Sequence, residues 1–357
     1  MPVLDTLFSQ LLDRNGSDLH LLQGQKPKMR VHGHLAEVDG SDVLDGVALQ
    51  RMMKELCSTE DWNTFVETKD FDFAYQFGTV SRFRANYYFQ HSGLAAVFRA
   101  IPHKILTLED LGLPQILYTF AKQRSGLILV TGPTGSGKST TLAAILNEIN
   151  EHESRYILTI EEPIEFVHPH KKSYFCQREV GRNTPGFAEA LRSASRLDCD
   201  VILVGELRDY DTISAALSAV SMGKLVLGTL HTNSAIKTID RVIDVFPYDE
   251  QWKARNMLAD SLFGVCAQIL LKGKDGNGRV AANEILLNVQ GVASSIRESN
   301  LSNIRNIMQS NQTSGMQLMD DAIEQHLKAG LIDSHEAYEK ARDKKRFKLF
   351  QEKEGDL

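Results

Sequence analysis

A glycine-rich segment carries the residue types and the spacing that bind phosphate. Residues 132–140 contain the complete pattern G-x-x-x-x-G-K-[ST], between an apolar run at 127–130 and a helical pattern at 141–146. Backbone N–H groups of such a loop converge on phosphate oxygens, the Lys138 ammonium reaches the β- and γ-phosphates, and the Ser139 hydroxyl binds Mg²⁺. A glycine turn that binds nothing is the alternative, but strand, loop and helix together favour nucleoside triphosphate binding. The residues predicted to bind it are Gly132, Pro133, Thr134, Gly135, Ser136, Gly137, Lys138, Ser139 and Thr140.

Two further apolar runs end in carboxylates. The run 201–204 is followed by Glu206, and a carboxylate at the carboxyl end of a strand beside a phosphate loop is where Mg²⁺ and its waters need a negative partner. The run 157–160 ends in Glu161 and Glu162. A carboxylate on a neighbouring strand can orient or deprotonate the attacking water, although paired acids at a strand end are otherwise solvated turn residues.

One histidine and two arginines are the remaining candidates for phosphate chemistry. The apolar run 225–227 leads into Gly-Thr-Leu-His-Thr-Asn, where His231 can sense phosphate through its imidazole; a histidine after a strand is otherwise a structural residue. Arg84 and Arg99 lie on candidate strands near the N-terminus. The planar fork of arginine suits a γ-phosphate, but surface strands carry arginines routinely, so residue type alone does not assign them.

The N-terminal part of the chain has the pattern of a small α+β domain. Apolar residues at helical spacing predict one amphipathic helix over residues 3–15. A second helical segment is expected near residues 49–67. The predicted strands are 18–22, 28–31, 71–76, 81–90 and 95–100. We therefore expect a first domain over residues 1–102, followed by a connector rich in turn formers at 103–114.

Strand and helix patterns alternate in the second part, residues 115–357. The expected elements are strands at 127–131, 155–160, 200–204 and 225–230 and helices at 141–150, 186–196 and 210–221. This alternation indicates βαβ units on a parallel sheet. From about residue 248 the pattern is mostly helical, broken by a Gly/Asp/Asn hairpin turn at 272–279. The fold class is thus α/β, with a helical C-terminal part.

The composition limits the classes of protein that the chain can be. A length of 357 residues favours two domains, and 42% hydrophobic with 24% charged residues is ordinary for a globular protein. The net charge of -6 gives no general attraction to nucleic acid or anionic membranes. Four widely spaced cysteines without a CxxC pair indicate reduced thiols in the cytoplasm. No apolar run of about 18 residues occurs, and Asp5 interrupts the N-terminus, so neither a transmembrane segment nor a signal peptide is expected.

The C-terminal stretch 336–348 is highly charged. Its basic residues, grouped around Phe347, are Lys340, Arg342, Lys344, Lys345, Arg346 and Lys348. A solvated helix end and a docking surface for an acidic partner or membrane are both compatible with this pattern.

Taken together, these segments resemble the secretion-ATPase superfamily, and within it the PilT-type ATPases that retract type IV pili. The resemblance covers nearly the whole chain. Residues 16–21 resemble the ASDLHL signature, 81–86 and 97–102 the two arginine-bearing strands, 160–166 the Asp box, 200–209 the Walker B segment and 228–232 the His box. Each segment is moderately specific, whereas their order and combination are highly specific.

The resemblance implies a PAS-like N-terminal domain, a RecA-like ATPase domain and a homohexameric ring with ATP between subunits. It further implies that Arg84 and Arg99 face the triphosphate, that Glu161 assists the attacking water, that Glu206 serves Mg²⁺ and its waters, and that His231 belongs to the catalytic set. The implied function is ATP hydrolysis that drives pilus retraction and twitching motility. The implied location is cytoplasmic, peripheral to the inner membrane, where the ring acts on a platform protein.

Three departures from the family pattern leave a second function open. Glu162 stands where aspartate is usual, Cys199 replaces a proline before Asp200, and residues 292–298 keep only the final Ile-Arg-Glu of the AIRNLIRE retraction signature. An accessory subunit of the PilU kind, which binds nucleotide and supports a paralogous retraction ATPase, is therefore the alternative.

Two other functions fit the sequence less well. The absence of a spaced cysteine quartet and the short N-terminal region disfavour the pilus-assembly and type II secretion ATPases. Net acidity and the lack of an aromatic-basic groove disfavour a DNA translocase, so no nucleic-acid partner is expected.

Overall fold

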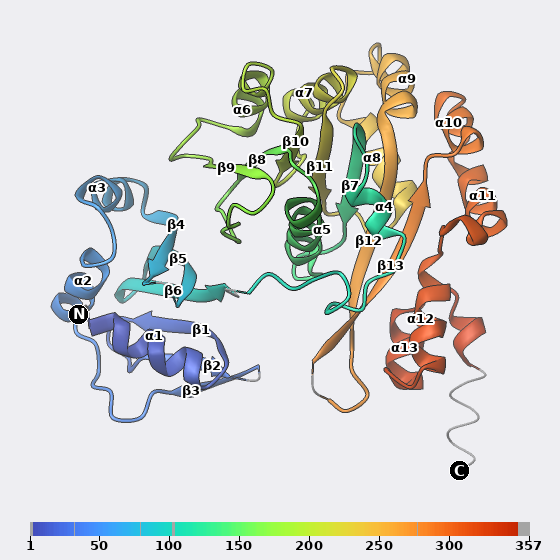
Figure 1. Cartoon of the computed structure of the whole chain (residues 1–357). Helices are drawn as coiled ribbons and strands as arrows, with labels where there is room; N and C mark the ends of the chain where they lie inside the picture. The colour runs from blue at the N-terminus through green and yellow to red at the C-terminus, as the bar shows by residue number, and fades with distance from the viewer. Residues whose placement is uncertain (1–2, 32, 79, 102–103, 277, 349–357) are drawn as a thin grey trace. The chain divides into compact units, whose positions relative to one another are not determined.

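Two units make up the computed structural model, which describes residues 3–31, 33–78, 80–101, 104–276 and 278–348 (Figure 1). The first unit comprises Met1–Lys104 together with Pro163–Val167, and the second comprises Ile105–Glu162 and His168–Leu357. Residues 102 and 103, where the first domain was expected to end and the connector to begin, lie outside the described residues. The remainder of the expected connector, from residue 105 onward, groups with the second unit.

The first unit is built on an antiparallel sheet of six strands in the order β3-β2-β1-β6-β5-β4. Its elements are α1 (Val3–Asp13), β1 (Gly16–Leu22), β2 (Lys28–Val31), β3 (His34–Glu37), α2 (Gly46–Lys54), α3 (Thr59–Thr68), β4 (Asp70–Phe77), β5 (Ser81–Gln90) and β6 (Gly93–Ile101). The predicted strands are present, and β3 is additional. The helical segment expected near 49–67 is two helices, because Ser58 and Asp61 form a capping box that starts α3.

One face of this sheet is covered and the other carries polar side chains. Leu19, Phe83 and Phe98 point to the covered face, where they join residues of α1, α2 and α3 in one hydrophobic core. Because successive strand residues point to opposite faces, Arg84 and Arg99 lie on the other face. The amphipathic pattern of β5 and β6 thus places both arginines on the polar face of the sheet.

The second unit is built on a seven-stranded sheet in the order β13-β12-β7-β11-β10-β8-β9. Its strands are β7 (Gly126–Thr131), β8 (Tyr156–Glu161), β9 (Tyr174–Glu179), β10 (Val201–Val204), β11 (Leu225–Leu230), β12 (Leu262–Lys272) and β13 (Arg279–Leu287). All neighbouring pairs are parallel except β12 and β13, which are antiparallel. The predicted parallel sheet is therefore present and is extended on both sides.

Helices cover both faces of this sheet (Figure 1). They are α4 (Leu117–Ala121), α5 (Lys138–His152), α6 (Phe187–Ala194), α7 (Tyr210–Ser221), α8 (Ala235–Asp244), α9 (Gln251–Ser261), α10 (Gln290–Arg297), α11 (Ile304–Ser310), α12 (Met319–Lys328) and α13 (Ser334–Lys340). Residues of α4 and α5 pack on one face and residues of α6 to α10 on the other. Double coverage explains the continuous apolar runs of the central strands. Within the described ranges, no helix combines the length and the apolar composition that spanning a bilayer requires.

The prediction of mostly helical structure after residue 248 is wrong for β12 and β13. These strands form a hairpin whose turn falls at the predicted position, 272–279. β12 runs between β13 and β7 and is almost entirely buried, so its sequence LFGVCAQILLK lacks the alternation of a half-exposed strand. An apolar run of this kind cannot be distinguished from a buried helix by periodicity.

Candidate functional site

The strand order brings four predicted motifs to one edge of the sheet. The neighbouring strands β7, β11, β10 and β8 are parallel, so their carboxyl ends share that edge (Figure 1). The glycine-rich loop 132–137 follows β7, His231 follows β11, Glu206 lies just beyond β10, and Glu161 ends β8. Carboxyl ends of parallel strands are where α/β proteins bind ligands. The fold thus gathers residues that lie up to a hundred positions apart in the sequence.

Two positions of the loop require glycine, because of their backbone conformation and the close approach of Gln268. Gly132 and Gly137 have φ angles of 145° and 84°. A Cβ at Gly132 would lie 2.2 Å from the carbonyl oxygen of Gln268, and one at Gly137 would lie 2.9 Å from its Nε2. Lys138 begins α5, and its Nζ donates to the carbonyls of Gly132 and Pro133 at 2.8 and 3.1 Å. The loop therefore places an ammonium group and a helix N-terminus together, the arrangement that binds phosphate.

A buried glutamine that the sequence analysis missed holds this loop from β12. Gln268 is 2% exposed, and its Nε2 donates to the carbonyl of Ser136 at 2.6 Å. Its Oε1 accepts from the hydroxyl of Thr141 and the amide of Asn283, both at 2.9 Å. The Ser136 hydroxyl is itself buried and has no hydrogen-bond partner among the described residues, so it is a donor suited to a phosphate oxygen. A glutamine inside an apolar run was the only sequence signal.

Glu206 is held on both sides by the strands that flank it. The N–H of Gly205 donates to the carbonyl of Ile160 at 2.8 Å, and the N–H of Leu207 donates to the carbonyl of Thr229 at 2.9 Å. Its carboxylate lies 3.3 Å from Nε2 of His231 and 3.3 Å from Nε of Arg208. The structure thus brings the predicted carboxylate and histidine into direct contact.

The two acids at the end of β8 have different surroundings. Glu161 accepts hydrogen bonds from the hydroxyl of Thr159 at 2.7 Å and from Nε2 of Gln177 on β9 at 3.3 Å. Glu162 forms an ion pair with Arg208, which also contacts Glu206. The glutamate that departs from the family pattern is therefore joined to the predicted metal-binding carboxylate through one guanidinium.

Hydroxyl groups connect the end of β7 with the segment that contains His231. The hydroxyl of Thr238 on α8 lies 3.3 Å from that of Thr131 and 2.7 Å from that of Thr232. It also donates to the carbonyl of Ser234 at 2.8 Å. The residue before the phosphate loop and the residue after His231 thus share one hydrogen-bonded neighbour.

The two predicted arginines lie directly opposite each other on β5 and β6. Arg84 pairs with Asp72 at 3.2 Å, and Nε of Arg99 lies 2.8 Å from the buried carboxylate of Asp18. Burial by itself would raise the pKa of Asp18, but hydrogen bonds from Ser17 and Arg99 outweigh it and hold this pKa below its ordinary value. Both arginines belong to the first unit, whereas the other predicted site residues belong to the second.

The structure shows the contacts at two of the departures from the family pattern. Cys199 is buried, and Asp200 is bonded to Tyr156 twice, through its N–H at 2.9 Å and its carboxylate at 2.8 Å. The start of β10 is thus held to β8 by two hydrogen bonds. In the segment 292–298, Ile296 is buried and Arg297 pairs with Asp260.

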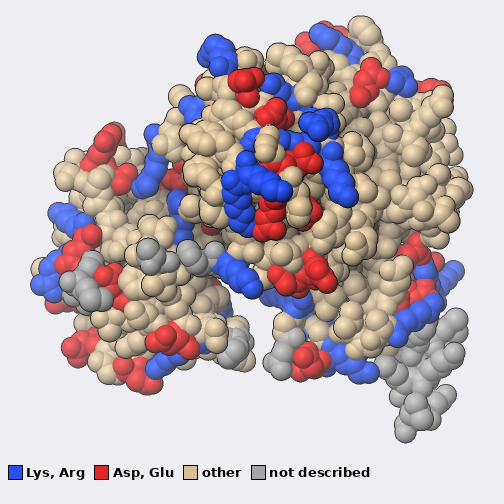
Figure 2. Space-filling model, in the orientation of Figure 1, with Lys and Arg blue, Asp and Glu red and all other residues tan. Residues whose placement is uncertain are grey.

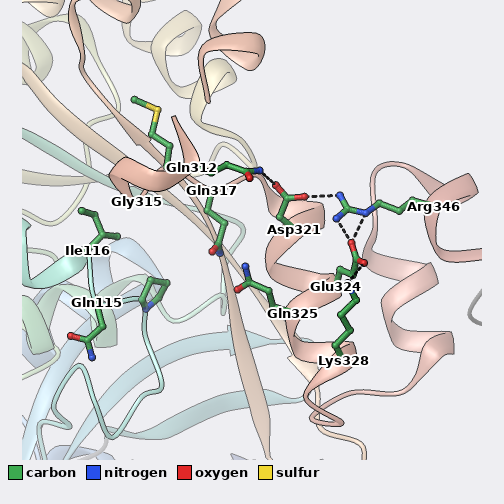
Figure 3. A pocket seen from close by; sticks show the side chains of 12 residues that line it. Gln115, Ile116, Gln312, Gly315, Gln317, Asp321, Glu324, Gln325, Lys328 and Arg346 are labelled. Carbon is green, nitrogen blue, oxygen red and sulfur yellow. Dashed lines mark hydrogen bonds and ion pairs between the residues drawn. The ribbon is translucent and has the colours of Figure 1, made fainter. Parts of the chain in front are cut away.

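A separate pocket of about 480 Å³ lies in the second unit, between residues 114–116 and residues of its C-terminal part. Figure 3 shows Gln312, Asp321, Glu324 and Arg346 on its wall, joined by hydrogen bonds and ion pairs. None of the predicted site residues lines it. The residues predicted from the sequence to bind and hydrolyse a nucleotide therefore lie outside this pocket.

The fold and this sheet edge define an α/β protein of the phosphate-loop class. The family model described as type II/IV secretion system protein matches residues 1–352, and the chain belongs to this family. The type IV pilus retraction ATPase PilT of Pseudomonas aeruginosa is 46% identical over 92% of this chain and 95% of its own. The type IV pilus ATPase PilU of the same organism is 34% identical over 93% and 87%. The crystal structure of the pilus retraction motor PilT with bound ADP is 40% identical, covers 97% of this chain and 98% of that one, and has a TM-score of 0.89.

Proposed function

We propose that the protein is an ATPase that drives type IV pilus retraction in twitching motility. The observation that carries this proposal is the gathering of the loop 132–137, Glu206, His231 and Glu161 at one sheet edge. Phosphate-loop proteins use nucleoside triphosphates for many purposes, so the fold alone does not choose among them. The 46% identity to a pilus retraction ATPase over nearly the full length favours pilus retraction.

Each residue at the sheet edge has a role in this proposal. The loop N–H groups, the Ser136 hydroxyl and Lys138 bind the phosphates of ATP, and Glu161 orients the attacking water. His231, in contact with Glu206, responds to the γ-phosphate.

Ser139 and Glu206 are the residues that would hold Mg²⁺. Hydroxyl and carboxylate oxygens are ligands that Mg²⁺ prefers, so this pair fits the ion. Among the described residues, no group of three or more His, Cys, Asp or Glu side chains is placed to hold a metal alone. Phosphate oxygens and waters would complete the shell, and the ion, when bound, neutralises charge on the phosphates.

The proposal extends to a larger assembly. We propose a PAS-like domain over residues 1–102, a linker over 103–114 and a RecA-like domain over 115–357, assembled as a homohexamer with ATP between subunits. Arg84 and Arg99 then face a triphosphate and stabilise its charge, for which their planar forks are suited. The ring would act on a platform protein from the cytoplasmic side of the inner membrane.

An accessory subunit of the PilU kind is the second candidate. The incomplete retraction signature at 292–298 favours it, because only the final Ile-Arg-Glu remains. The lower identity to PilU, 34% against 46%, favours the motor. A DNA translocase has no observation in its favour, and on the face shown in Figure 2 basic and acidic side chains are interspersed.

The test combines turnover with the pilus phenotype. We expect the purified protein to release phosphate from ATP steadily, and we expect Lys138→Ala and Glu206→Gln to abolish this while the exposed-surface control Lys122→Ala retains it. A gene deletion should leave excess surface pili without twitching, and only the wild-type and Lys122→Ala genes should restore motility. Tight ATP binding with negligible turnover would assign the accessory role, and absent pili would assign assembly.

A further inference from the structure

The charged C-terminal stretch is built into the second unit. Phe347 is fully buried in a cluster with residues of α12 and α13. The N–H groups of Arg342 and Asp343 donate to the carboxylate of Asp320 at 2.8 and 2.9 Å, and Asp320 is a buried residue of α12. The basic residues of the stretch are exposed except for the half-buried Arg346, as a solvated helix end predicts, but the position of the Arg342 backbone is set by α12.

The side chain of Arg342 joins two acceptors from different parts of the unit. Its Nη1 donates to Glu284 on β13 at 2.5 Å, and its Nη2 donates to the carbonyl of Asn233. Glu284 is 2% exposed and also accepts the N–H groups of Ala235 at 2.7 Å and Met319 at 3.4 Å, the first residues of α8 and α12. One buried carboxylate thus meets two helix N-termini, which favour negative charge, and one guanidinium, which compensates it.

The second acceptor, Asn233, belongs to the segment that carries His231. His231 contacts the carboxylate of Glu206, and Thr232 is hydrogen-bonded to Thr238. Asn233 is the next residue, and its carbonyl is bonded to the guanidinium. The segment 231–233 is therefore attached at consecutive residues to the predicted catalytic carboxylate, to α8 and to the C-terminal segment.

We propose that Arg342 is a positioning residue for ATP hydrolysis. By bonding Glu284 and the Asn233 carbonyl together, it holds the segment 231–233 in the conformation in which His231 meets Glu206. It thereby links this segment to α12 and α13, so that a displacement of the C-terminal helices alters the contact at the sheet edge. The inference rests on the proposed function only for the roles of His231 and Glu206 in hydrolysis.

The chemistry of the guanidinium explains why an arginine is used. Its planar fork donates to two acceptors at once, whereas a lysine ammonium is a point charge on a flexible stem. Arg342→Lys therefore keeps a positive charge beside the buried Glu284 but gives up the bond to Asn233. Any effect of this substitution therefore reports on the positioning of the segment 231–233, because the positive charge that compensates Glu284 is kept.

The matched control is the neighbouring arginine of the same segment. Arg346 pairs with Asp321 at 2.6 Å and with Glu324, both on α12 (Figure 3), and its side chain is 34% exposed, against 35% for that of Arg342. We would measure kcat and KM for ATP hydrolysis, thermal unfolding, and hydrogen exchange of the amides of residues 229–235 in Arg342→Lys and Arg346→Ala. Each variant would also be combined with His231→Ala.

We expect Arg342→Lys to lower kcat about tenfold with KM changed less than about twofold, since the lost contact orients a catalytic group without binding substrate. Its unfolding temperature should match that of Arg346→Ala, and only Arg342→Lys should speed exchange at residues 229–235. In the His231→Ala background, Arg342→Lys should cause no further loss of kcat, as expected for residues that act as a unit.

Equal losses of kcat with and without His231 would overturn the inference, as would unchanged exchange at 229–235 in Arg342→Lys. Exchange that rises in both arginine variants alike would also overturn it, because general loosening would then be the cause. A wild-type protein without phosphate release would contradict the proposed function instead, and the exchange measurement would still decide whether Arg342 holds the segment.

Discussion

Single residues around the site are held by neighbours that sequence patterns do not reveal, and His168 is one of them. Its imidazole is buried and stacks on Phe175, with ring centroids 4.5 Å apart and planes 3° from parallel. Burial, assisted by the charge of Lys171, lowers the pKa of His168 from its ordinary 6.5 to about 4. The backbone N–H of His168 donates to Oε1 of Gln177, whose Nε2 in turn donates to Glu161. The backbone of His168 is therefore two hydrogen bonds away from the residue proposed to orient water, and the packing of its neutral ring on Phe175 helps to hold that backbone in place.

Acid should destabilise β9 and the segment around His168 before it affects the rest of the second unit. The unfolded histidine takes up a proton below pH 6.5, whereas the native one does so only near pH 4, so stability falls as the pH drops through that window. The expected loss in the opening free energy of β9 is about 2 kcal/mol between pH 7 and pH 5 and about 3 kcal/mol by pH 4. Hydrogen exchange of the β9 amides, corrected for the intrinsic rate, measures it.

The substitution His168→Phe removes the titrating group and should flatten this pH dependence. His170→Phe, which alters a neighbouring ring stacked on Tyr174, should leave it in place because His168 is retained. An equal pH dependence in wild type and His168→Phe would refute the assignment.

At the scale of elements, the hairpin β12–β13 supports the phosphate loop from the side. β12 lies next to β7, and its Gln268 reaches the loop at Ser136 and α5 at Thr141. The same hairpin carries Asn283, bonded to Gln268, and Glu284, bonded to α8 and α12. The two strands that were predicted to be helical thus carry the polar side chains that connect the phosphate loop to α8 and α12.

Gln268→Leu should weaken nucleotide binding without unfolding the protein. It removes the donor to Ser136 and the acceptor of the Thr141 hydroxyl, and it leaves the Asn283 amide with Sγ of Cys266 as its acceptor. We expect the dissociation constant for ADP to rise about tenfold, equivalent to roughly 1.4 kcal/mol, the size of one buried hydrogen bond. Leu271→Met, a volume-conserving change at a buried position of the same strand, is the control, and equal affinities in the two variants would contradict the role assigned to Gln268.

At the scale of the whole molecule, the distribution of candidate residues between two units demands an explanation. Arg84 and Arg99 lie opposite each other on the polar face of the first sheet, paired with acids, while the phosphate loop is in the second unit. The proposed ring accounts for this distribution, because a pocket shared between subunits takes its arginines and its loop from different chains. Binding of a triphosphate would replace carboxylate partners of these arginines with phosphate.

Subunit mixing tests this arrangement directly. Lys138→Ala and Arg99→Ala should each be inactive alone, because every pocket then lacks one of the two residues. In a one-to-one mixture that is allowed to exchange subunits, about a quarter of the interfaces combine an intact loop with an intact arginine, so about a quarter of the activity should return. The mixture of Lys138→Ala with Glu206→Gln, two changes in the same unit, should recover none. Failure of the first mixture after proven exchange would rule out shared pockets.

Much of the fold was predictable where one physical signal dominated. The amphipathic helix at 3–15 and the strands of the first unit followed from apolar periodicity, and β7, β8, β10 and β11 followed from apolar runs between turn formers. β9 was missed because its residues are largely polar, and the hairpin β12–β13 was misread because burial on both faces removes alternation.

The sequence by itself determined the phosphate loop and the order of the motifs that follow strands, because residue type and spacing are local properties. Only the tertiary structure decided which side chains support them. Gln268, Glu284 and Arg342 act through contacts between residues more than fifty positions apart, and local periodicity contains no information about such pairs. The strand order β7-β11-β10-β8 brings the separate motifs together at one edge of the sheet. This order depends on the packing of the whole sheet, so local sequence patterns do not reveal it.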